Sequence, residues 1–308
     1  MPSLALPRPL RDDLVTSAGR RRDAVLAGNP ELAAAVDLQG RLLTRVIDLA
    51  DAIERGRPPR LSLPPRYLAA KLASGVPILS GEPIPLPVAL LTPALVGFCQ
   101  DLGQGGAGEA ATHIARALES GELDGGSLAT ASLARNQDAV RTGALHRGLS
   151  PDLLWLVGEL AASPAAHALQ RRLLAAAPGT PLAQATAAWQ QGYCPACGSW
   201  PALAEVVDGR RVLLCSFCAA AWELEGPRCI YCGESGDLFE RVTPDERRPC
   251  HRLQVCRACT GYLKEADRSE ISPFPLASIT DLETTDLDVT AFERRLGRPP
   301  MKSFAGRP

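Results

Sequence analysis

The chain has 308 residues, of which 46% are hydrophobic and 22% charged, and its formal net charge is −1. This composition is typical of a soluble globular protein, and a chain of this length usually folds into about two domains, each with its own core. The near-zero charge argues against a dedicated nucleic-acid binder, because such proteins are usually strongly basic.

The opening residues alternate proline, arginine and aspartate with short apolar pieces. They lack the continuous apolar stretch, roughly 7–15 residues long, that a secretory signal contains. The most apolar later run, residues 84–99, is interrupted by Pro85, Pro87 and Pro93, which disfavours a membrane-spanning helix. We therefore expect a cytoplasmic protein without a membrane span.

The pattern of residues 1–190 predicts an all-α bundle. Apolar residues recur at helical spacing, for example from Leu38 to Ile53. Five pairs place a capping side chain directly before a proline, which is favoured at the first helical position because its missing N–H would be unpaired there. These five predicted helix starts are Asn29-Pro30, Thr92-Pro93, Ser150-Pro151, Ser163-Pro164 and Thr180-Pro181.

Eight of the ten cysteines lie in four C-x-x-C pairs between residues 194 and 259. The gap between the first two pairs is 17 residues and the gap between the last two is 23, close to the spacing of two-knuckle, four-cysteine metal sites. Two residues between the cysteines of a pair let a tight turn aim both sulfurs at one ion. The predicted ligands are Cys194, Cys197, Cys215 and Cys218 in one site and Cys229, Cys232, Cys256 and Cys259 in the other.

The segments that join these pairs carry strand patterns. Residues 203–207 and 212–214 flank Asp208-Gly209, a favoured type I′ turn, and predict a β-hairpin, with Trp222 and Leu224 in a third short strand. The second unit repeats this plan, with predicted strands at residues 238–242, 253–255 and 262–263.

We therefore predict an α+β fold. A helical N-terminal domain (residues 1–190) is followed by two tandem small β units of the zinc-ribbon or rubredoxin-like kind (residues 191–226 and 227–268). Each unit is expected to hold one metal ion on its four cysteines. A short C-terminal segment (residues 269–308) is expected to pack back on the body.

The identity of the metal stays open at this point. Four thiolates in a tetrahedron suit zinc, but the same set holds a single iron in rubredoxin. Eight thiolates shared by two ions leave no open coordination position, so a catalytic metal-bound water is not expected. Redox-active dithiols are expected between a strand and a helix, and structural disulfides in secreted proteins, so both of these readings are disfavoured.

The remaining cysteines and the histidines do not form an active-site pattern. Three histidines on separate predicted helices are expected to be surface or hydrogen-bonded core residues: His113, His146 and His167. His251 lies beside Cys250 in the second unit, where four cysteines already complete the site. Cys99 is expected to be a small buried hydrophobe, and the role of Cys250 stays open. Because the sequence contains no phosphate loop, nucleophile elbow or pair of catalytic carboxylates, we do not expect an enzyme.

Charge also bears on nucleic-acid binding by the β units. From Cys194 to Lys264, nine basic residues balance nine acidic ones. A surface that held DNA or RNA would need a net positive charge to gain from counterion release. A zinc-ribbon nucleic-acid or transcription-associated module is therefore the alternative function, with a local patch of Arg247, Arg248 and Arg252 in its favour.

Four cysteine motifs and one later segment resemble those of a known family. The motifs are Cys194-Pro195-x-Cys197-Gly198-Ser199-x-Pro201, Leu214-Cys215-x-x-Cys218, Arg228-Cys229-x-x-Cys232-Gly233 and Cys256-x-x-Cys259-x-x-Tyr262-x-Lys264. The later segment is residues 281–288, Asp-Leu-Glu-Thr-Thr-x-Leu-Asp. Together they resemble the FdhE-type formate dehydrogenase accessory proteins, and the likeness extends in layout to the helical part.

The resemblance implies a cytoplasmic helper and not a catalyst. Such proteins are needed for active formate dehydrogenases that are exported across the inner membrane, and the helper is thought to bind the catalytic subunit before export. Their C-x-x-C motifs are associated with iron in a rubredoxin-like setting. We therefore expect an accessory protein for formate dehydrogenase maturation, whose metals act as a redox checkpoint or as structural staples.

Four aromatic residues lie beside the cysteine motifs: Trp200, Phe217, Tyr231 and Tyr262. Two roles are open for them. Aromatic side chains on rigid turns are good anchors for a protein partner, but small domains must also cover their own metal sites and junctions with such side chains.

Overall fold

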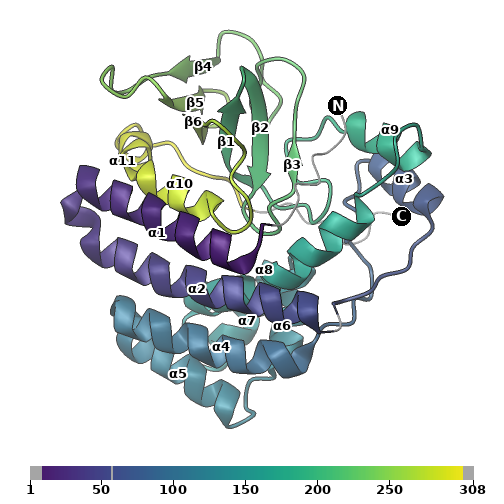
Figure 1. Ribbon diagram of the computed structural model, residues 1–308, viewed down its shortest axis with the longest axis vertical. Coiled ribbons are helices and arrows are strands. Elements are labelled where there is room, and N and C mark those ends of the chain that lie inside the picture. The colour runs from purple at the N-terminus through teal and green to yellow at the C-terminus, as the bar shows by residue number, and fades with distance from the viewer. Residues whose placement is uncertain (1–8, 57, 301–308) are drawn as a thin grey trace. The chain divides into compact units, whose positions relative to one another are not determined.

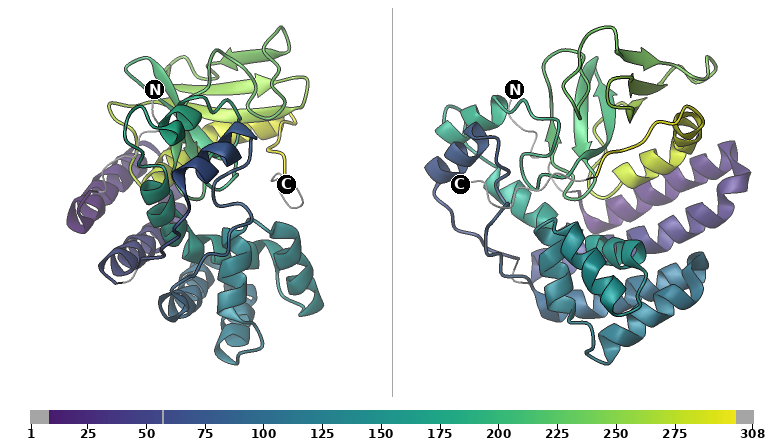
Figure 2. Two further views of the ribbon diagram at one scale, coloured as in Figure 1. Left: turned by 90° about the vertical axis from the view of Figure 1, so that its right-hand side faces the viewer. Right: turned by 180° about the vertical axis from the view of Figure 1, so that it is seen from behind.

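A computed structural model describes residues 9–56 and 58–300. The described chain divides into two compact units, one formed by residues 9–62 and 81–172 and the other by residues 63–80 and 173–300. Our expectations for the two ends of the chain rest partly on residues 1–8 and 301–308, which lie outside the described residues. Figures 1 and 2 show that the first of these units is helical and that the second contains the sheet.

Apolar stripes hold the helical unit together. Leu42, Val46 and Ile53 of the predicted stripe are buried on α2, and Leu95 and Phe98 are buried on α4, which packs against α2. The elements are α1 (Arg11–Gly28), a 3-10 turn (Pro30–Leu32), α2 (Ala33–Arg55), α4 (Val88–Leu102), a π-helical turn (Gly103–Ala107), α5 (Gly108–Glu119), α6 (Gly125–Leu133), α7 (Gln137–His146) and α8 (Pro151–Leu173). No helix among the described residues is both long and apolar enough to cross a membrane.

The five predicted helix starts have different outcomes. Ser150-Pro151 and Thr180-Pro181 begin helices, and the Thr180 hydroxyl accepts the Ala183 N–H at 3.3 Å. Asn29-Pro30 begins only the 3-10 turn that leads into α2. The other two predictions are wrong, since Pro93 lies inside α4 and Pro164 lies inside α8.

Local compensation explains why α8 continues through its proline. Proline at position 164 removes the N–H that would bond to the Leu160 carbonyl four residues earlier. The Ser163 hydroxyl donates to that same carbonyl at 3.4 Å, so the carbonyl is not left unpaired. A serine before a proline therefore supports either a helix start or a continuing helix, and the pair alone does not distinguish them.

The second unit is built on a six-stranded sheet (Figure 1). Its strands are β1 (Pro201–Val207), β2 (Arg210–Cys215), β3 (Ala221–Trp222), β4 (Phe239–Val242), β5 (His251–Cys256) and β6 (Gly261–Asp267). The predicted strands are confirmed except that β3 ends at Trp222 and leaves out Leu224. Positive φ angles at Asp208 (50°) and Gly209 (75°) agree with the predicted type I′ turn.

The two predicted ribbons share this one sheet. The strand order is β3-β2-β1-β6-β5-β4, and every neighbouring pair is antiparallel except β1 and β6. That parallel pair, which aligns Ala204 with Glu265, joins one three-stranded ribbon to the other. The α+β fold class is confirmed, with the ribbons fused edge to edge.

One face of the sheet is covered by the last two helices, α10 (Ala277–Glu283) and α11 (Thr285–Glu293). Leu203 and Leu214 pack with Ala277 under α10, and Leu253 packs with Leu287 and neighbouring residues under α11. The remaining helices of this unit, α3 (Pro65–Ala73) and α9 (Pro181–Ala187), pack against each other.

Buried charges fasten α10 and α11 to the sheet. Lys264, only 1% exposed, places its Nζ 2.6 Å from Asp281 Oδ1 and 2.6 Å from Asp288 Oδ2. Buried Glu205 accepts hydrogen bonds from the Ser272 N–H at 2.7 Å and from the Thr280 hydroxyl at 3.2 Å. Asp281 and Asp288 of segment 281–288 are thus paired with a lysine of the same unit.

Candidate metal centres

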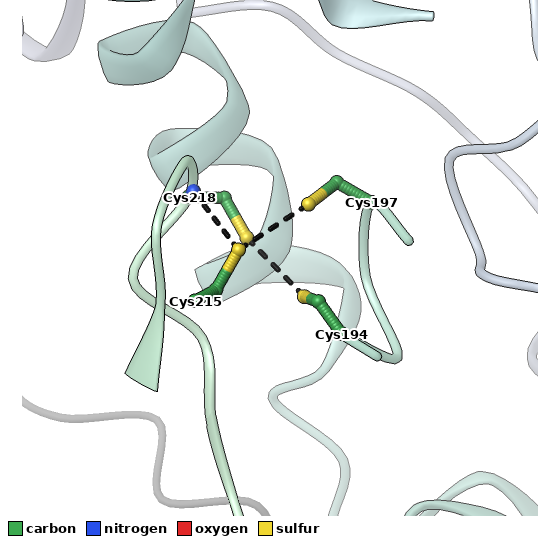
Figure 3. A group of neighbouring side chains, drawn as sticks. All are labelled: Cys194, Cys197, Cys215 and Cys218. Carbon is green, nitrogen blue, oxygen red and sulfur yellow. Dashed lines mark hydrogen bonds between the residues drawn. The ribbon is translucent and has the colours of Figure 1, made fainter. Parts of the chain in front are cut away.

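The first four-cysteine group is formed by two cysteine pairs whose side chains face each other (Figure 3). Cys194 and Cys197 belong to the turn before β1, Cys215 ends β2, and Cys218 lies in the turn between β2 and β3. All four are buried, and their sulfurs lie within 4.8 Å of one another. The closest sulfur pairs are 3.4 and 3.6 Å apart. A tetrahedron with metal–sulfur bonds of about 2.3 Å has edges of roughly 3.8 Å, so the group fits one ion.

The second group has the same arrangement at the other half of the sheet. Cys229 and Cys232 lie in the turn before β4, Cys256 ends β5, and Cys259 lies between β5 and β6. Their sulfurs also lie within 4.8 Å of one another, with the two closest pairs at 3.6 Å. Cys232 is exposed, so this group is more open to solvent than the first.

All four cysteine turns share one backbone conformation. The residue after the second cysteine has positive φ in each: Gly198, Ala219, Gly233 and Thr260. At the two glycines, the N–H donates to the carbonyl of the first cysteine of the pair, at 2.9 Å from Gly198 and 3.0 Å from Gly233. The glycines were visible in the sequence, but the other two positions were missed, because alanine and threonine rarely adopt this conformation.

The sulfurs of the first group also accept backbone hydrogen bonds. The N–H groups of Ala196, Phe217 and Cys218 donate to cysteine sulfurs at 3.3 to 3.4 Å. These N–H dipoles partly offset the charge that thiolates carry when they hold a metal. In this buried group, they favour the charged form without adding a charged side chain.

A disulfide fits neither group, and a redox dithiol does not fit the first. A disulfide has its sulfurs about 2.05 Å apart, whereas all described cysteines are free thiols with closest sulfur distances of 3.4 to 3.6 Å. A reactive dithiol usually has a lowered thiol pKa. Burial instead raises the pKa values of Cys194 and Cys218 well above the ordinary thiol value. These thiols stay protonated at neutral pH unless a cation such as a metal ion stabilises the thiolate.

A distant part of the chain supports the first group. The N–H groups of Ile78 and Leu79 donate to the carbonyls of Pro195 and Ala196, the two residues between the first pair of cysteines, at 3.0 and 2.9 Å. The Tyr193 hydroxyl donates to the Gly75 carbonyl at 2.7 Å. Sequence reasoning missed this segment, because nothing in its own pattern relates it to cysteines so far along the chain.

Aromatic side chains connect the two groups. Trp189, Tyr193, Trp200 and Tyr231 form a chain of edge-to-face contacts with centroid separations of 5.4, 6.1 and 5.0 Å. Trp200 follows the first cysteine turn and Tyr231 lies within the third. Phe217 is buried, and the Tyr231 hydroxyl donates to the Tyr262 carbonyl at 2.9 Å. Of the two roles open for these aromatics, the geometry favours covering the sites and their junction.

Gly192 lies tightly against the backbone of Ile230, in the third cysteine turn. A Cβ built at this position would lie 1.8 Å from the Ile230 carbonyl oxygen, which belongs to backbone and cannot turn away. We expect Gly192→Ala to lower the free energy of unfolding by at least about 1–3 kcal/mol, the usual cost of overpacking. Chemical denaturation of the metal-loaded protein measures this change. Gly297→Ala, whose Cβ would meet nothing within 4 Å, is the matched control, and equal stability of both variants would contradict the close approach.

The other residues singled out in the sequence lie outside both groups. Cys99 is buried, and burial raises its pKa to about 12, as expected of a buried hydrophobe. Cys250 is exposed. His113 and His146 are exposed, and His167 contacts Gln170 at 3.4 Å in the core. His251 begins β5, at the end of the strand opposite Cys256, and its Nε2 lies 3.9 Å from Glu283.

The arginine patch that favoured nucleic-acid binding is largely occupied. Arg252 pairs with Glu265 and Asp267. Arg248 pairs with Asp286 at 3.2 Å and donates to the Glu283 carbonyl at 3.0 Å. A guanidinium that already holds a carboxylate gains little from a phosphate, so this patch gives the alternative function little support.

Comparisons with known proteins agree with the cysteine motifs. No family model matches the chain. The FdhE homologue of Pseudomonas putida is 36% identical over 120 residues, which are 35% of this chain and 37% of that protein. The FdhE homologue of Aquifex aeolicus is 28% identical over 111 residues (34% and 39%), and that of Edwardsiella ictaluri is 32% identical over 126 residues (40% of each). The chain thus matches about two fifths or less of the length of these relatives.

The fold is similar over a much longer range. The crystal structure of the FdhE protein from Pseudomonas aeruginosa superposes with a TM-score of 0.60 and covers 97% of both chains, at 23% sequence identity. The resemblance predicted from the cysteine motifs and from residues 281–288 is therefore confirmed: this chain is similar to FdhE proteins in sequence and in fold.

Proposed function

We propose that this protein is an accessory factor for the maturation of formate dehydrogenase and is not itself a catalyst. The observation that carries the proposal is the pair of four-cysteine groups within one sheet, in a chain that resembles FdhE proteins. Four thiolates around one ion leave no position for a substrate or a reactive water, so these centres suit structure or electron transfer better than hydrolysis.

Each group is proposed to hold one iron or zinc ion, through Cys194, Cys197, Cys215 and Cys218 or through Cys229, Cys232, Cys256 and Cys259. The two centres differ in exposure, and this difference suggests different roles. The first is enclosed and suits a structural ion. The second, with Cys232 at the surface, is the better candidate for a redox checkpoint, because solvent and oxidants reach it.

The proposed partner is the formate dehydrogenase catalytic subunit, bound in the cytoplasm before export. The support for this partner is the family resemblance described above. A rigid metal-loaded sheet suits the role, since metal binding supplies folding energy to small β units and fixes the surface that they present.

Affinity purification of the tagged protein from its own cells, without oxygen, tests this proposal. We expect mass spectrometry to find the unexported catalytic subunit of formate dehydrogenase among the bound proteins. The matched control is the same purification with Cys194 and Cys197 replaced by serine, which should recover less of that subunit. Recovery of RNA polymerase, ribosomes or nucleic acid in its place would contradict the proposal and support the alternative of a nucleic-acid-binding module.

A further inference from the structure

The face of the sheet opposite α10 and α11 carries a cavity of about 490 Å³. Five of the six strands, which Figure 1 labels, contribute to it, together with the segment that leaves β3. Its charged and amide side chains are Arg211, Arg241, Arg252, Gln254, Glu265 and Asp267. Its volume lies within the roughly 300–1,000 Å³ that is typical of small-molecule sites.

The strand register explains why these side chains meet. Arg211 on β2 is opposite Val206 on β1, and Val206 is opposite Asp267 on β6. Arg252 on β5 is opposite Glu265 on β6. Residues opposite each other in neighbouring strands point to the same face, so the polar residues form one continuous surface across the ribbon junction. The alternate residues point to the other face, toward α10 and α11.

The two acidic residues of the cavity are already paired. Glu265 is fully buried, forms ion pairs with Arg241 and Arg252, and accepts a hydrogen bond from Gln254 at 2.7 Å. Asp267 pairs with Arg252. Arg241 and Arg252 thus pair with the two carboxylates, whereas Arg211, the third arginine of the cavity, pairs with neither.

Arg211 is a half-buried cation that pairs with no carboxylate among the described residues. Its Nη2 atom is buried without a hydrogen-bond partner. Burial, together with the charges of Arg241 and Arg228, lowers the pKa of Arg211 to about 10. The Nε atom of Arg228 is likewise buried and unpaired. A charged donor left without an acceptor is costly, and an anion bound in the cavity would offset this cost.

We propose that this cavity binds a small oxyanion, the phosphate or carboxylate group of a small molecule, on the guanidinium of Arg211. The planar fork of a guanidinium matches two oxygens of either group. Leu224, Pro227 and Phe239 also line the cavity and provide apolar surface for a carbon skeleton. No cysteine lines the cavity, although the charge of Cys229 acts on Arg211 and raises its pKa. The proposal does not depend on the function proposed above.

Calorimetric titration of the full-length, metal-loaded protein tests this site. Inorganic phosphate and acetate are titrated separately, each against chloride at the same ionic strength. We expect saturable binding of at least one of them, and Arg211→Met should weaken it roughly 10- to 100-fold, the usual effect of losing charge-assisted hydrogen bonds. Binding of phosphate alone identifies a phosphate site, and binding of acetate alone identifies a carboxylate site.

A neighbouring arginine provides the matched control. Arg210 precedes Arg211 on β2 and pairs with Glu223, so Arg210→Met removes the same charge from the opposite face of the strand. Without anion, Arg211→Met should have a thermal midpoint equal to or above that of the wild type, because it removes an uncompensated, half-buried charge. The proposal is wrong if neither anion binds more strongly than chloride, or if Arg210→Met weakens binding as much as Arg211→Met.

Discussion

Replacement of Cys194 by serine is expected to lower the metal content from two ions to one per chain and to destabilise the first ribbon. Cys194 is fully buried and supplies one of the four sulfurs of the enclosed group. A structural zinc site contributes on the order of 10 kcal/mol to folding, and a serine hydroxyl is a poor substitute for a thiolate. We therefore expect a loss of several kcal/mol in the free energy of unfolding, measured by denaturation alongside elemental analysis.

Two further variants make this experiment specific. Cys250→Ser removes an exposed thiol that belongs to neither group, so it should retain both ions and the wild-type stability. Cys232→Ser alters the exposed corner of the second group and should release the second ion at a smaller cost in stability. If Cys194→Ser kept two ions and unfolded at the wild-type denaturant concentration, Cys194 would not be a metal ligand.

The double replacement Asp281→Asn and Asp288→Asn is expected to lower the free energy of unfolding by about 3–5 kcal/mol. These two carboxylates are the ion-pair partners of Lys264, which is almost fully buried. Removing both leaves an ammonium group inside the unit without a compensating charge, the situation in which broken buried pairs are most costly. Chemical denaturation gives the stability, and hydrogen exchange of α10 and α11 should report local loosening.

Addition of Lys264→Met to the double variant separates the charge effect from other consequences. Methionine fills a similar volume without a charge, and replacing a buried ion pair by apolar side chains is often nearly neutral. The triple variant should therefore recover part of the lost stability, but not all of it, because Arg298 also pairs with Asp281 at 3.6 Å and with Asp288 at 3.5 Å and loses both partners. A triple variant as unstable as the double one would show that the two aspartates stabilise the unit by some route other than Lys264.

The cysteine groups were the most predictable part of the molecule. A C-x-x-C pair restricts both sulfurs to one turn, and the number of residues between pairs matches a short hairpin, so spacing alone assigns Cys194 to one group and Cys229 to another. Strand positions followed from alternation between two such turns. The helix starts at Thr92-Pro93 and Ser163-Pro164 failed because both prolines lie within helices. At Pro164 the Ser163 hydroxyl satisfies the freed carbonyl, and the local sequence pattern does not reveal this.

The long-range features could not be predicted from the sequence, for a different reason. Lysine is almost never fully buried unless it is paired, so nothing in the sequence marks Lys264 as a core residue until its two aspartates are seen beside it. The parallel pairing of β1 with β6 also leaves no signal in the sequence, because it joins strands that belong to the two separate predicted ribbons. The cavity around Arg211 follows from this pairing and was missed with it.

The hydrogen bonds from Ile78 and Leu79 to the first cysteine turn have a consequence for biosynthesis. This segment leaves the ribosome long before the cysteines that it supports, and the helical stretch of residues 81–172 is made in between. The enclosed centre is therefore completed only after that helical stretch has been synthesised and the chain has returned to its earlier segment. We therefore expect the hydrogen bonds that support this centre to form late in synthesis, after residues 81–172 have been made.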